Sequence, residues 1–534
     1  MAGITVAKIH PVPSAIGLGL LLAAASVLAA GATVAAWRGF RGATWIWGGG
    51  IVFAAGLAGF VVLHLRYPHL HDPADRPIRE VTVTLESQRV FPGAADARTL
   101  SGLGRVIAAD AHNAELVGQP VYFSVIKRIS APPRQGGHYV LTGVLEPLPV
   151  NGGADDFSAY LKSLGIRHRL TRAHAETETR APGRSRQFCA RAETHLEAIL
   201  RLGPRDHAQI TSLYLAMLLG EKAELSPQQE AAFMRSGTFH IFSISGLHVG
   251  VIAAALYVVL QFLRLPSWLL TIVSLTLLWL YVQITGGSAP AERAFLMIAF
   301  LMASRIARLP GNPLAALAAA ALVTLLGDPM QLFNTGFQMS YGVVAALIMM
   351  AVPLSERLLA GWRPFALLPK DNWRWHHHLR AGGVSGLIGS GAVSWVAFLA
   401  STPAGIGYFN LLSFGALAAN LIIIPLSSLA IIAGFISLLT GLVGLSPISA
   451  VFNYAATVIL IVMDWLVRHG TTIPGMYFDA AFRQPWMAPA AMALMTATLL
   501  AGVAGRWRSR YGGFWTPAVV LALILIFSVK FGAP

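Results

Sequence analysis

Residues 411–442 read LLSFGALAANLIIIPLSSLAIIAGFISLLTGL, without a charged side chain. A helix needs roughly 20 mostly apolar residues to cross the hydrocarbon core of a bilayer. This stretch is long enough for one crossing, and Pro425 inside it leaves open two crossings, or one crossing with a re-entrant piece. The stretch therefore predicts an integral membrane protein.

The composition of the whole chain indicates the same class of protein. Of its 534 residues, 55% are hydrophobic and 12% are charged, whereas soluble domains carry about 25% charged residues. A single soluble core stops growing near roughly 250–300 residues, so this much apolar surface requires lipid. The lone cysteine, Cys189, excludes an intrachain disulfide and a cysteine-based zinc cluster.

We expect a polytopic α-helical membrane protein with about 11 to 13 membrane segments, some of them broken or re-entrant. The expected segments are Ser14–Ala36, Thr44–Leu63, Phe239–Leu263, Trp268–Ile284, Ala294–Ala307, Pro313–Leu326, Phe337–Val352, Gly383–Leu399, Leu411–Leu442, Ile448–Val467, Ala488–Val503 and Pro517–Val529.

The loop charges predict the orientation of these segments. The formal net charge is +15. A nucleic-acid partner could explain this excess, but the basic residues lie mainly in loops, which favours the tendency of cytoplasmic loops to collect Lys and Arg. Arg38 and Arg41, loop 355–381 and loop 506–510 are therefore expected in the cytoplasm. The N-terminus and the segment after Leu63 then lie outside, and 411–442 makes a single net crossing.

The polar region between the second and third expected spans reads as a small water-facing domain. Its first half alternates in the manner of β-strands, as in Val81–Thr84, Val121–Ile126 and Tyr139–Leu145, with turn residues between the runs. Several short strands predict a small antiparallel barrel or sandwich. Asp156–Leu164 predicts a short helix, and Arg186–Leu202 an amphipathic helix that lies on the membrane or packs on the domain.

Polar groups interrupt several apolar stretches. Ser245 and His248 share a helix face in the run 239–250, and Gly246 and Gly250 form a small-residue pair that permits close packing. Further interruptions occur at 285–293, 336–341, 401–405 and around Asn420. Irregular backbone at membrane depth survives only where protein or a water-filled cavity satisfies it, so we expect a cavity. For each polar residue, simple packing between helices remains the alternative.

An ordered series of motifs resembles the ComEC family of competence proteins. The run Ile244-Ser245-Gly246-Leu247-His248-Val249 carries the resemblance. The other residues of the series are Phe157, Tyr160-Leu161, Gly165-Ile166, Leu218-Leu219-Gly220-Glu221, Phe233, Gly237, Gly287, Pro290, Arg293-Ala294, Arg308, Asn312, Leu314-Ala315, Asp328-Pro329, Gly336-Phe337-Gln338-Met339-Ser340, Ser413, Asn420 and Pro425.

The resemblance implies an OB-like extracytoplasmic domain inserted into a channel for single-stranded DNA in the bacterial inner membrane, and no enzyme activity. The residues expected to line the DNA path are Ser245, Gly246, His248, Gly286, Gly287, Arg293, Gln338, Ser340 and Asn420. Those expected to contact DNA on the small domain are Tyr122, Lys127, Arg128, Arg134 and Tyr139, with burial of Tyr122, Phe123 and Tyr139 in the domain core as the alternative.

The expected domains are 1–65 (two transmembrane helices), 66–185 (OB-like domain), 186–235 (linker helices), 236–470 (channel domain) and 471–534 (C-terminal transmembrane helices). The implied partners are single-stranded DNA, membrane lipid, a competence DNA receptor and cytoplasmic DNA-processing proteins; a homo-oligomer stays open. Many members of the family end in a metallo-β-lactamase-like domain, which we expect to be absent here.

No cofactor or metal is expected. His69-Leu70-His71-Asp72 lacks the spacing of a metal-dependent hydrolase motif, and His376-His377-His378 lies in a basic loop that solvent surrounds. Two other functions stay open: a transporter or channel for another polyanion or polar polymer, and, more remotely, a membrane-embedded hydrolase that uses Ser245 with His248.

Overall fold

The computed structural model describes residues 2–9, 26–27, 43–67, 78–91, 99–126, 133–148, 156–203, 207–221, 225–242, 244–309, 311–362, 373–507 and 513–532. The chain divides into two compact units, Met1–Arg186 with Ala321–Gln338, and Gln187–Ala320 with Met339–Pro534. The expectations for the span Ser14–Ala36, for His69–Asp72, and for Lys127 and Arg128 lie outside the described residues.

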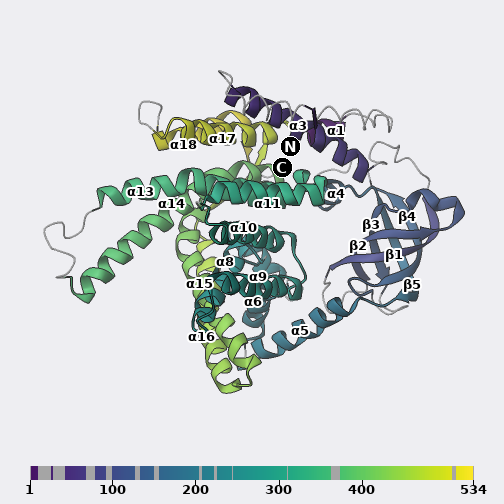
Figure 1. The fold of residues 1–534 in the computed structure, drawn as a ribbon, viewed down its shortest axis with the longest axis horizontal. Coiled ribbons are helices and arrows are strands. Elements are labelled where there is room, and N and C mark those ends of the chain that lie inside the picture. The colour runs from purple at the N-terminus through teal and green to yellow at the C-terminus, as the bar shows by residue number, and fades with distance from the viewer. Residues whose placement is uncertain are drawn as a thin grey trace. The chain divides into compact units, whose positions relative to one another are not determined.

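The first unit contains a closed five-stranded barrel (Figure 1). Its strands are β1 (Arg79–Phe91), β2 (Thr99–Ala109), β3 (Pro120–Ile126), β4 (His138–Pro147) and β5 (His168–Arg180). They neighbour one another in the order β1-β2-β3-β5-β4; β3 and β5 are parallel and the other pairs antiparallel. The predicted small β-domain is confirmed, and its topology is that of an OB-like barrel.

The barrel interior follows from the period-2 pattern of the strands. Val81, Val83 and Leu85 alternate inward along β1, and Val121, Phe123 and Val125 along β3. Gly102 and Gly104 on β2 leave room for interior side chains, because a Cβ at Gly104 would overlap Leu85 and a Cβ at Gly102 would overlap the Phe123 ring. Alternation thus predicted the faces, while the glycines permit close packing of the interior.

The first unit also holds helices α1 (Ala2–Ile9), α3 (Ala43–Arg66) and α4 (Asp156–Ser163), and the 3₁₀ helices η1 (Ala111–Leu116) and η4 (Pro329–Phe333). The Tyr67 hydroxyl, just after α3, donates to Asp328 Oδ1 at 2.8 Å, and the same oxygen accepts from Met330 N–H at 3.0 Å. Burial, together with the Asp328 carboxylate, raises the pKa of Tyr67. Asp328 therefore joins the end of α3 to η4.

The second unit is mainly helical. Its elements are α5 (Arg184–Leu200), α6 (Ala208–Leu218), α7 (Pro227–Arg235), η3 (Phe239–Phe242), α8 (Gly246–Gln261), α9 (Ser267–Ile284), α10 (Ala289–Ile306), η5 (Leu347–Ala351, a short π-helix), α13 (Val352–Gly361), α14 (Trp375–Phe409), α15 (Gly415–Leu442), α16 (Ser446–Gly470), α17 (Met487–Ala504), η8 (Gly513–Trp515) and α18 (Thr516–Ser528). Helices α11 (Pro313–Gly327) and α12 (Thr335–Ala346) each continue from one unit into the other.

Six helical stretches in the described residues are long and apolar enough to cross a membrane. They are Ser267–Ile284, Thr335–Gly361, Trp375–Phe409, Gly415–Leu442, Ser446–Gly470 and Met487–Ala504. Shorter apolar helices occupy Ala54–Arg66, Ala208–Leu218, Gly246–Gln261, Pro313–Gly327 and Gly513–Ser528. The prediction of a polytopic helical membrane protein is confirmed.

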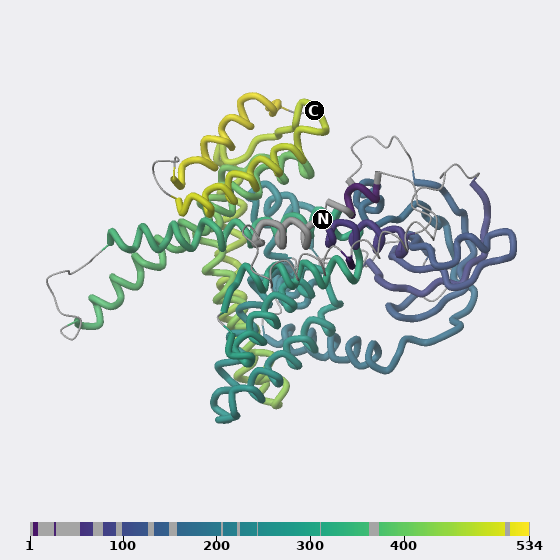
Figure 2. Tube along the Cα trace, turned by 45° about the horizontal axis from the view of Figure 1, so that its top comes forward, coloured from purple at the N-terminus to yellow at the C-terminus, as the bar shows by residue number. Residues whose placement is uncertain are grey.

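A small sheet gathers the ends of five of these helices. Its strands are β6 (Leu411–Ser413), β7 (Tyr477–Phe482) and β8 (Val529–Phe531), in the order β6-β7-β8. Strand β6 links α14 to α15, β7 lies between α16 and α17, and β8 follows α18. The antiparallel pairs α15–α16 and α17–α18 lie side by side (Figures 1 and 2). We call this end of the second unit the sheet end; the beginnings of α14 and α18 and the end of α17 form the opposite ends of these helices.

Two expected interruptions do not break their helices. α14 continues through Pro403 to Phe409, and α15 is one helix through Pro425, so 411–442 contains a single long helix. A proline removes one N–H and frees one carbonyl of the helix, which a side chain can satisfy. The carbonyl that Pro403 frees is that of Leu399; one residue earlier, the Thr402 hydroxyl donates to Phe398 O at 2.7 Å.

Candidate functional site

The first element of the candidate site is the beginning of α8. Ser245 occupies the N-cap position, and its backbone N–H donates to His248 Nδ1 at 3.3 Å. Nδ1 is thus an acceptor, so the Ser245 hydroxyl, 3.0 Å away, donates to it as well. The His248 side chain is fully buried, and its Nε2 has no hydrogen-bond partner among the described residues. The ring is therefore neutral, with its proton on Nε2.

The 3.0 Å between Ser245 Oγ and His248 Nδ1 would also suit a serine nucleophile and its base. A membrane-embedded hydrolase of this kind is the remote alternative given above. In such a dyad, an acidic group normally orients the second ring nitrogen. Nε2 has no such partner in the part of the chain that the structure describes. The geometry instead gives His248 the role that Glu or Gln plays at the third position of a capping box.

The second element is the turn between α9 and α10. Gly286 and Gly287 have φ of +82° and +59°, a conformation that residues with a Cβ rarely adopt. The turn places Arg293 in the first part of α10, where its side chain is 2% exposed. The ionisable side chains of Tyr341 and Glu292 lie near enough to interact electrostatically with the Arg293 guanidinium.

Packing brings the beginnings of α8 and α10 together. A Cβ built on Gly246 would lie 3.9 Å from the Ala294 Cβ, next to Arg293. The turn before η3 lies at the sheet end, because the Ser413 hydroxyl donates to Arg235 O at 2.9 Å. Ser245, Gly286, Gly287 and Arg293 thus lie at the sheet end of the second unit.

Buried polar groups without a protein partner are frequent at this end. Within the described residues, these atoms are His248 Nε2, Ser288 Oγ, Asn420 Oδ1 and Asp464 Oδ1. Buried polar atoms normally find a partner, because an unpaired one costs about 1–3 kcal/mol. His248, Asn420 and Asp464 belong to α8, α15 and α16, and Ser288 directly precedes α10. The sheet end is therefore a place where water or a polar ligand would be stabilised.

The remaining expected path residues lie on α12. Gln338 belongs to the first unit and donates from Nε2 to Leu332 O at 2.9 Å, which stabilises the turn before its own helix. Ser340 belongs to the second unit and is half-buried.

The barrel separates its expected DNA-contacting residues. Tyr139 is 4% exposed; its hydroxyl accepts from Arg134 N–H at 3.0 Å and donates to Glu178 Oε1 at 3.2 Å. Phe123 is fully buried. Tyr122 lies on the outside of β3, where the Phe157 ring meets it edge-on at 5.3 Å.

Tyr122 belongs to an aromatic cluster that sequence reasoning missed. Phe157 also contacts Phe91 at 6.4 Å and Tyr160 at 6.1 Å between ring centroids, and Phe157 is 46% exposed. The Arg89 guanidinium lies 5.6 Å from the Phe91 ring centroid. Helix α4 brings two of these rings to β3, a contact that no strand pattern could predict. Exposed rings beside a cation are typical of single-strand binding surfaces.

A second missed group lies on α16. Asp464 is 9% exposed, and its Oδ2 pairs with Arg468 Nε at 2.7 Å. An acid and an arginine four residues apart in an apolar helix were the available signal. Nearer the beginning of the same helix, Asn453 is fully buried. Its Nδ2 donates to Ile199 O and Leu202 O, each at 2.8 Å, and its Oδ1 accepts from the Tyr214 hydroxyl at 3.0 Å.

A model of the Competence protein family matches residues 217–508. These residues make up more than half of the chain and include the beginnings of α8 and α10. The chain belongs to the Competence protein family. The expected family membership is confirmed, and the match also covers Asn453, Asp464 and Arg468.

Three relatives of this Competence family chain have curated names. ComE operon protein 3 of Bacillus subtilis is 31% identical over 26% of this chain and 18% of its own length. Competence protein ComA of Neisseria gonorrhoeae is 36% identical over 26% of this chain and 21% of its own length. Recombination protein 2 of Haemophilus influenzae is 24% identical over 42% of this chain and 27% of its own length. The matched segments thus span less than a third of each relative, and no solved structure matches the chain significantly.

Proposed function

We propose that this Competence family chain forms an inner-membrane channel that carries single-stranded DNA into the cytoplasm during natural transformation. Family membership supports a role in DNA uptake, because the matching family is that of the competence proteins, and the relatives are named a competence protein, a ComE operon protein and a recombination protein. The matches cover only portions of the longer relatives. That this chain performs the complete activity of such a protein is therefore also proposed here.

The observation that carries the proposal is the concentration of buried, unpaired polar groups at the sheet end. A phosphate cannot cross hydrocarbon bare, so a DNA route must be polar and wet. Arg293, buried at the beginning of α10, supplies positive charge beside this region. Ser245, Gly246, His248, Gly286, Gly287, Arg293, Gln338, Ser340 and Asn420 remain the proposed path residues.

The charge of the loops supports an orientation for the route. Segments 355–381 and 505–513 include or adjoin the helix ends opposite the sheet end, and both are rich in arginine. Under the positive-inside rule they face the cytoplasm, so we place the sheet end outside. Arg38 and Arg41, in the loop before the second expected span, independently favour an outside position for the barrel. DNA would then meet the barrel and the unpaired polar groups before it crosses the apolar helices.

The test is the entry of labelled DNA in the native host. Cells that lack this chain are compared with cells that regain it from a plasmid, and DNA in the cytoplasm is scored apart from DNA bound outside. We expect deletion to abolish entry, leave outside binding intact, and be reversed by the plasmid. Unchanged entry in a host that transforms would overturn the DNA proposal, and labelled polar polymers of other classes would then be tested.

A further inference from the structure

The Asp464–Arg468 pair is an unusual feature of a membrane-spanning helix. Asp464 lies in α16 with its carboxylate nearly buried, at 13% side-chain exposure, while the Arg468 side chain keeps 39%. Asp464 Oδ2 and Arg468 Nε form an ion pair at 2.7 Å without the angles of a hydrogen bond, and Asp464 Oδ1 is buried without a partner in the described residues. Replacing a buried ion pair by apolar residues is often neutral or stabilising, so stability alone does not explain this pair.

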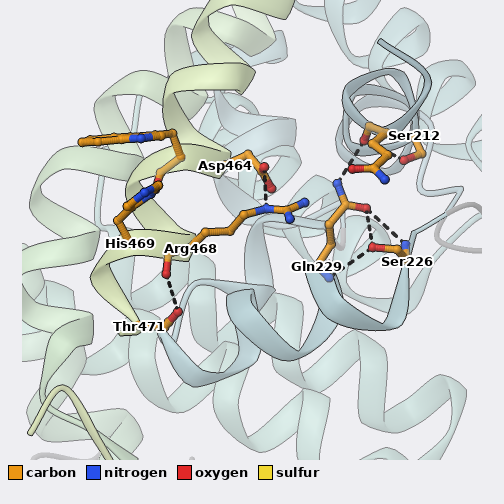
Figure 3. Close-up of polar contacts among 9 residues, drawn as sticks. Ser212, Ser226, Gln229, Asp464, Arg468, His469 and Thr471 are labelled. Atoms are coloured by element: carbon orange, nitrogen blue, oxygen red, sulfur yellow. Dashed lines mark hydrogen bonds and ion pairs between the residues drawn. The ribbon is translucent and has the colours of Figure 1, made fainter. Parts of the chain in front are cut away.

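The guanidinium extends from α16 toward α7 (Figure 3). On α7, Gln229 is 1% exposed; its Nε2 donates to Gln209 O at 3.0 Å, and its Oε1 accepts from Ser226 N–H at 3.1 Å. Gln229 is therefore held by other partners. Because the ion pair uses only Nε, the terminal amino groups of Arg468 remain able to donate to a further acceptor.

The position of Arg468 agrees with a role on the polar side of the unit. It lies in the last turn of α16, and the chain then reaches β7. The Arg235 guanidinium lies 5.3 Å from the ring centroid of Tyr477 on β7. Arg468 and Arg235 thus lie at the sheet end, which also holds Ser245, Arg293 and the unpaired polar atoms.

We propose that Arg468 contacts the phosphate groups of single-stranded DNA at the sheet end, and that Asp464 is the positioning residue that aims its guanidinium. This inference rests on the proposed function. The planar guanidinium can keep Nε on Asp464 while its terminal amino groups donate to phosphate oxygens, a geometry that suits arginine and not lysine. Asp464 also offsets the charge of Arg468 while no DNA is present.

The chain offers a matched control. Arg201 Nε pairs with Glu197 Oε1 at 2.7 Å, also four residues apart, with side-chain exposures of 40% and 28%. Its distance, spacing and arginine exposure match those of Arg468, but Glu197 is the more exposed acid, the pair lies at the end of the amphipathic helix α5, and Arg201 Nε donates a hydrogen bond to Glu197. The control thus tests whether an arginine pair of this spacing affects DNA binding away from the sheet end.

The experiment measures binding of a fluorescent thymidine homopolymer to the full chain in zwitterionic lipid nanodiscs. Changing Arg468 alone would leave the Asp464 carboxylate buried and unpaired, so both partners are changed together, as Asp464→Asn with Arg468→Gln, and as Glu197→Gln with Arg201→Gln in the control. Binding is followed from about 50 to about 200 mM salt, because each phosphate contact adds about 0.7 to the slope of log affinity against log salt for single strands.

We expect the slope to fall by about 0.7 for Asp464→Asn/Arg468→Gln and to stay at the wild-type value for Glu197→Gln/Arg201→Gln. Asp464→Asn alone keeps an acceptor for Nε and should keep the wild-type slope. An unchanged slope for the 464/468 variant, with wild-type DNA binding present, would overturn the role of Arg468 only. Failure of the wild-type chain to bind the homopolymer would overturn the proposed function as well.

Discussion

Ser245 and His248 hold each other at the beginning of α8, with Ser245 Oγ 3.0 Å and Ser245 N 3.3 Å from His248 Nδ1. The spacing of a capping box is present, with histidine at the position where Glu or Gln is usual. Because both donors act on Nδ1, the ring is neutral and presents its second N–H, at Nε2, to buried surroundings. One residue thus combines a structural role, at Nδ1, with an available donor, at Nε2.

The two roles of His248 can be separated by substitution. His248→Gln retains a side-chain acceptor for the Ser245 N–H, whereas His248→Ala removes it, so we expect only His248→Ala to lower the free energy of unfolding, by about 0.5–2 kcal/mol. Both variants should reduce DNA entry, since neither keeps the Nε2 donor in place. Thermal unfolding in detergent and entry of labelled DNA are the two measurements.

The comparison has a clear contrary result. If His248→Gln unfolds as the wild type does and also restores full DNA entry, His248 is only a capping residue. The motif around Ser245 would then position the beginning of α8 without touching the translocated strand.

Arg293 is predicted to be needed for DNA entry through its positive charge. Arg293→Ala should lower cytoplasmic DNA by more than about tenfold, because a hydrogen bond to a charged group contributes about 1.5–3 kcal/mol. Arg293→Lys should recover part of the loss. Arg305→Ala is the control, since Arg305 is exposed near the other end of the same helix. Entry is scored against the amount of inserted protein, and normal entry with Arg293→Ala would remove this residue from the path.

The sequence predicted the helices better than their interruptions. Long apolar runs give unambiguous helices, and the stretch 411–442, for which the basic loops predict one net crossing, contains the single helix α15. Pro403 and Pro425 were expected to mark breaks, but a helix tolerates proline where neighbouring groups satisfy the freed carbonyl. That compensation depends on tertiary contacts, which a single sequence does not reveal.

The site was predictable only where its residues are close in sequence. Ser245 and His248 share a helix turn, so their contact followed from spacing. Asn453 and Tyr214 lie far apart in the chain, and Phe157 reaches Tyr122 only because α4 packs against β3. Period-2 alternation places Tyr122 and Phe123 on opposite faces of β3, but it does not reveal which face an aromatic cluster covers.

The aromatic cluster on the barrel predicts a stacking contribution to DNA binding. Phe157→Ala should weaken binding of a single-stranded oligonucleotide to the full chain by about 1–3 kcal/mol, the usual contribution of one base stacked on an aromatic ring. Phe188→Ala is the matched control, because Phe188 is also exposed but belongs to α5. Fluorescence anisotropy measures both variants. Equal affinities for both would show that the cluster only packs α4 onto the barrel.

Glu193 on α5 predicts a pH dependence of stability. Burial, with smaller contributions from the Glu221 and Glu197 carboxylates, raises the pKa of Glu193 to about 7. The folded chain therefore binds this proton more tightly than the unfolded chain does, so this stabilisation is complete below the ordinary pKa of glutamate, about 4.3, and is lost as the pH rises through about 7.

Glu193→Gln should remove this dependence and raise the unfolding temperature above that of the wild type near pH 8. Thermal unfolding between about pH 5 and about pH 8, a range in which raised carboxylates titrate, is the measurement. Glu230→Gln serves as the control, because that side chain is exposed. A wild-type pH profile in Glu193→Gln would assign the dependence to other groups.

Asn453 should be among the most important residues for the stability of the second unit. Its side chain donates to the Ile199 and Leu202 carbonyls at the end of α5 and accepts from the Tyr214 hydroxyl; Asn453 and Tyr214 are buried and Leu202 is half-buried. Because Ile199 O also accepts from Leu202 N–H at 3.1 Å, Asn453→Leu would leave two polar groups unpaired, Leu202 O and the Tyr214 hydroxyl, at about 1–3 kcal/mol each.

Tyr214→Phe removes one of these bonds and leaves only Asn453 Oδ1 unpaired, so its cost should be about half of that of Asn453→Leu. Tyr454→Phe, at an exposed neighbouring position, should leave stability unchanged. Thermal unfolding in detergent ranks the three variants. If Asn453→Leu unfolded no earlier than Tyr214→Phe, water would have to satisfy the end of α5, and α16 would not anchor the helix that leads from the barrel into the membrane helices.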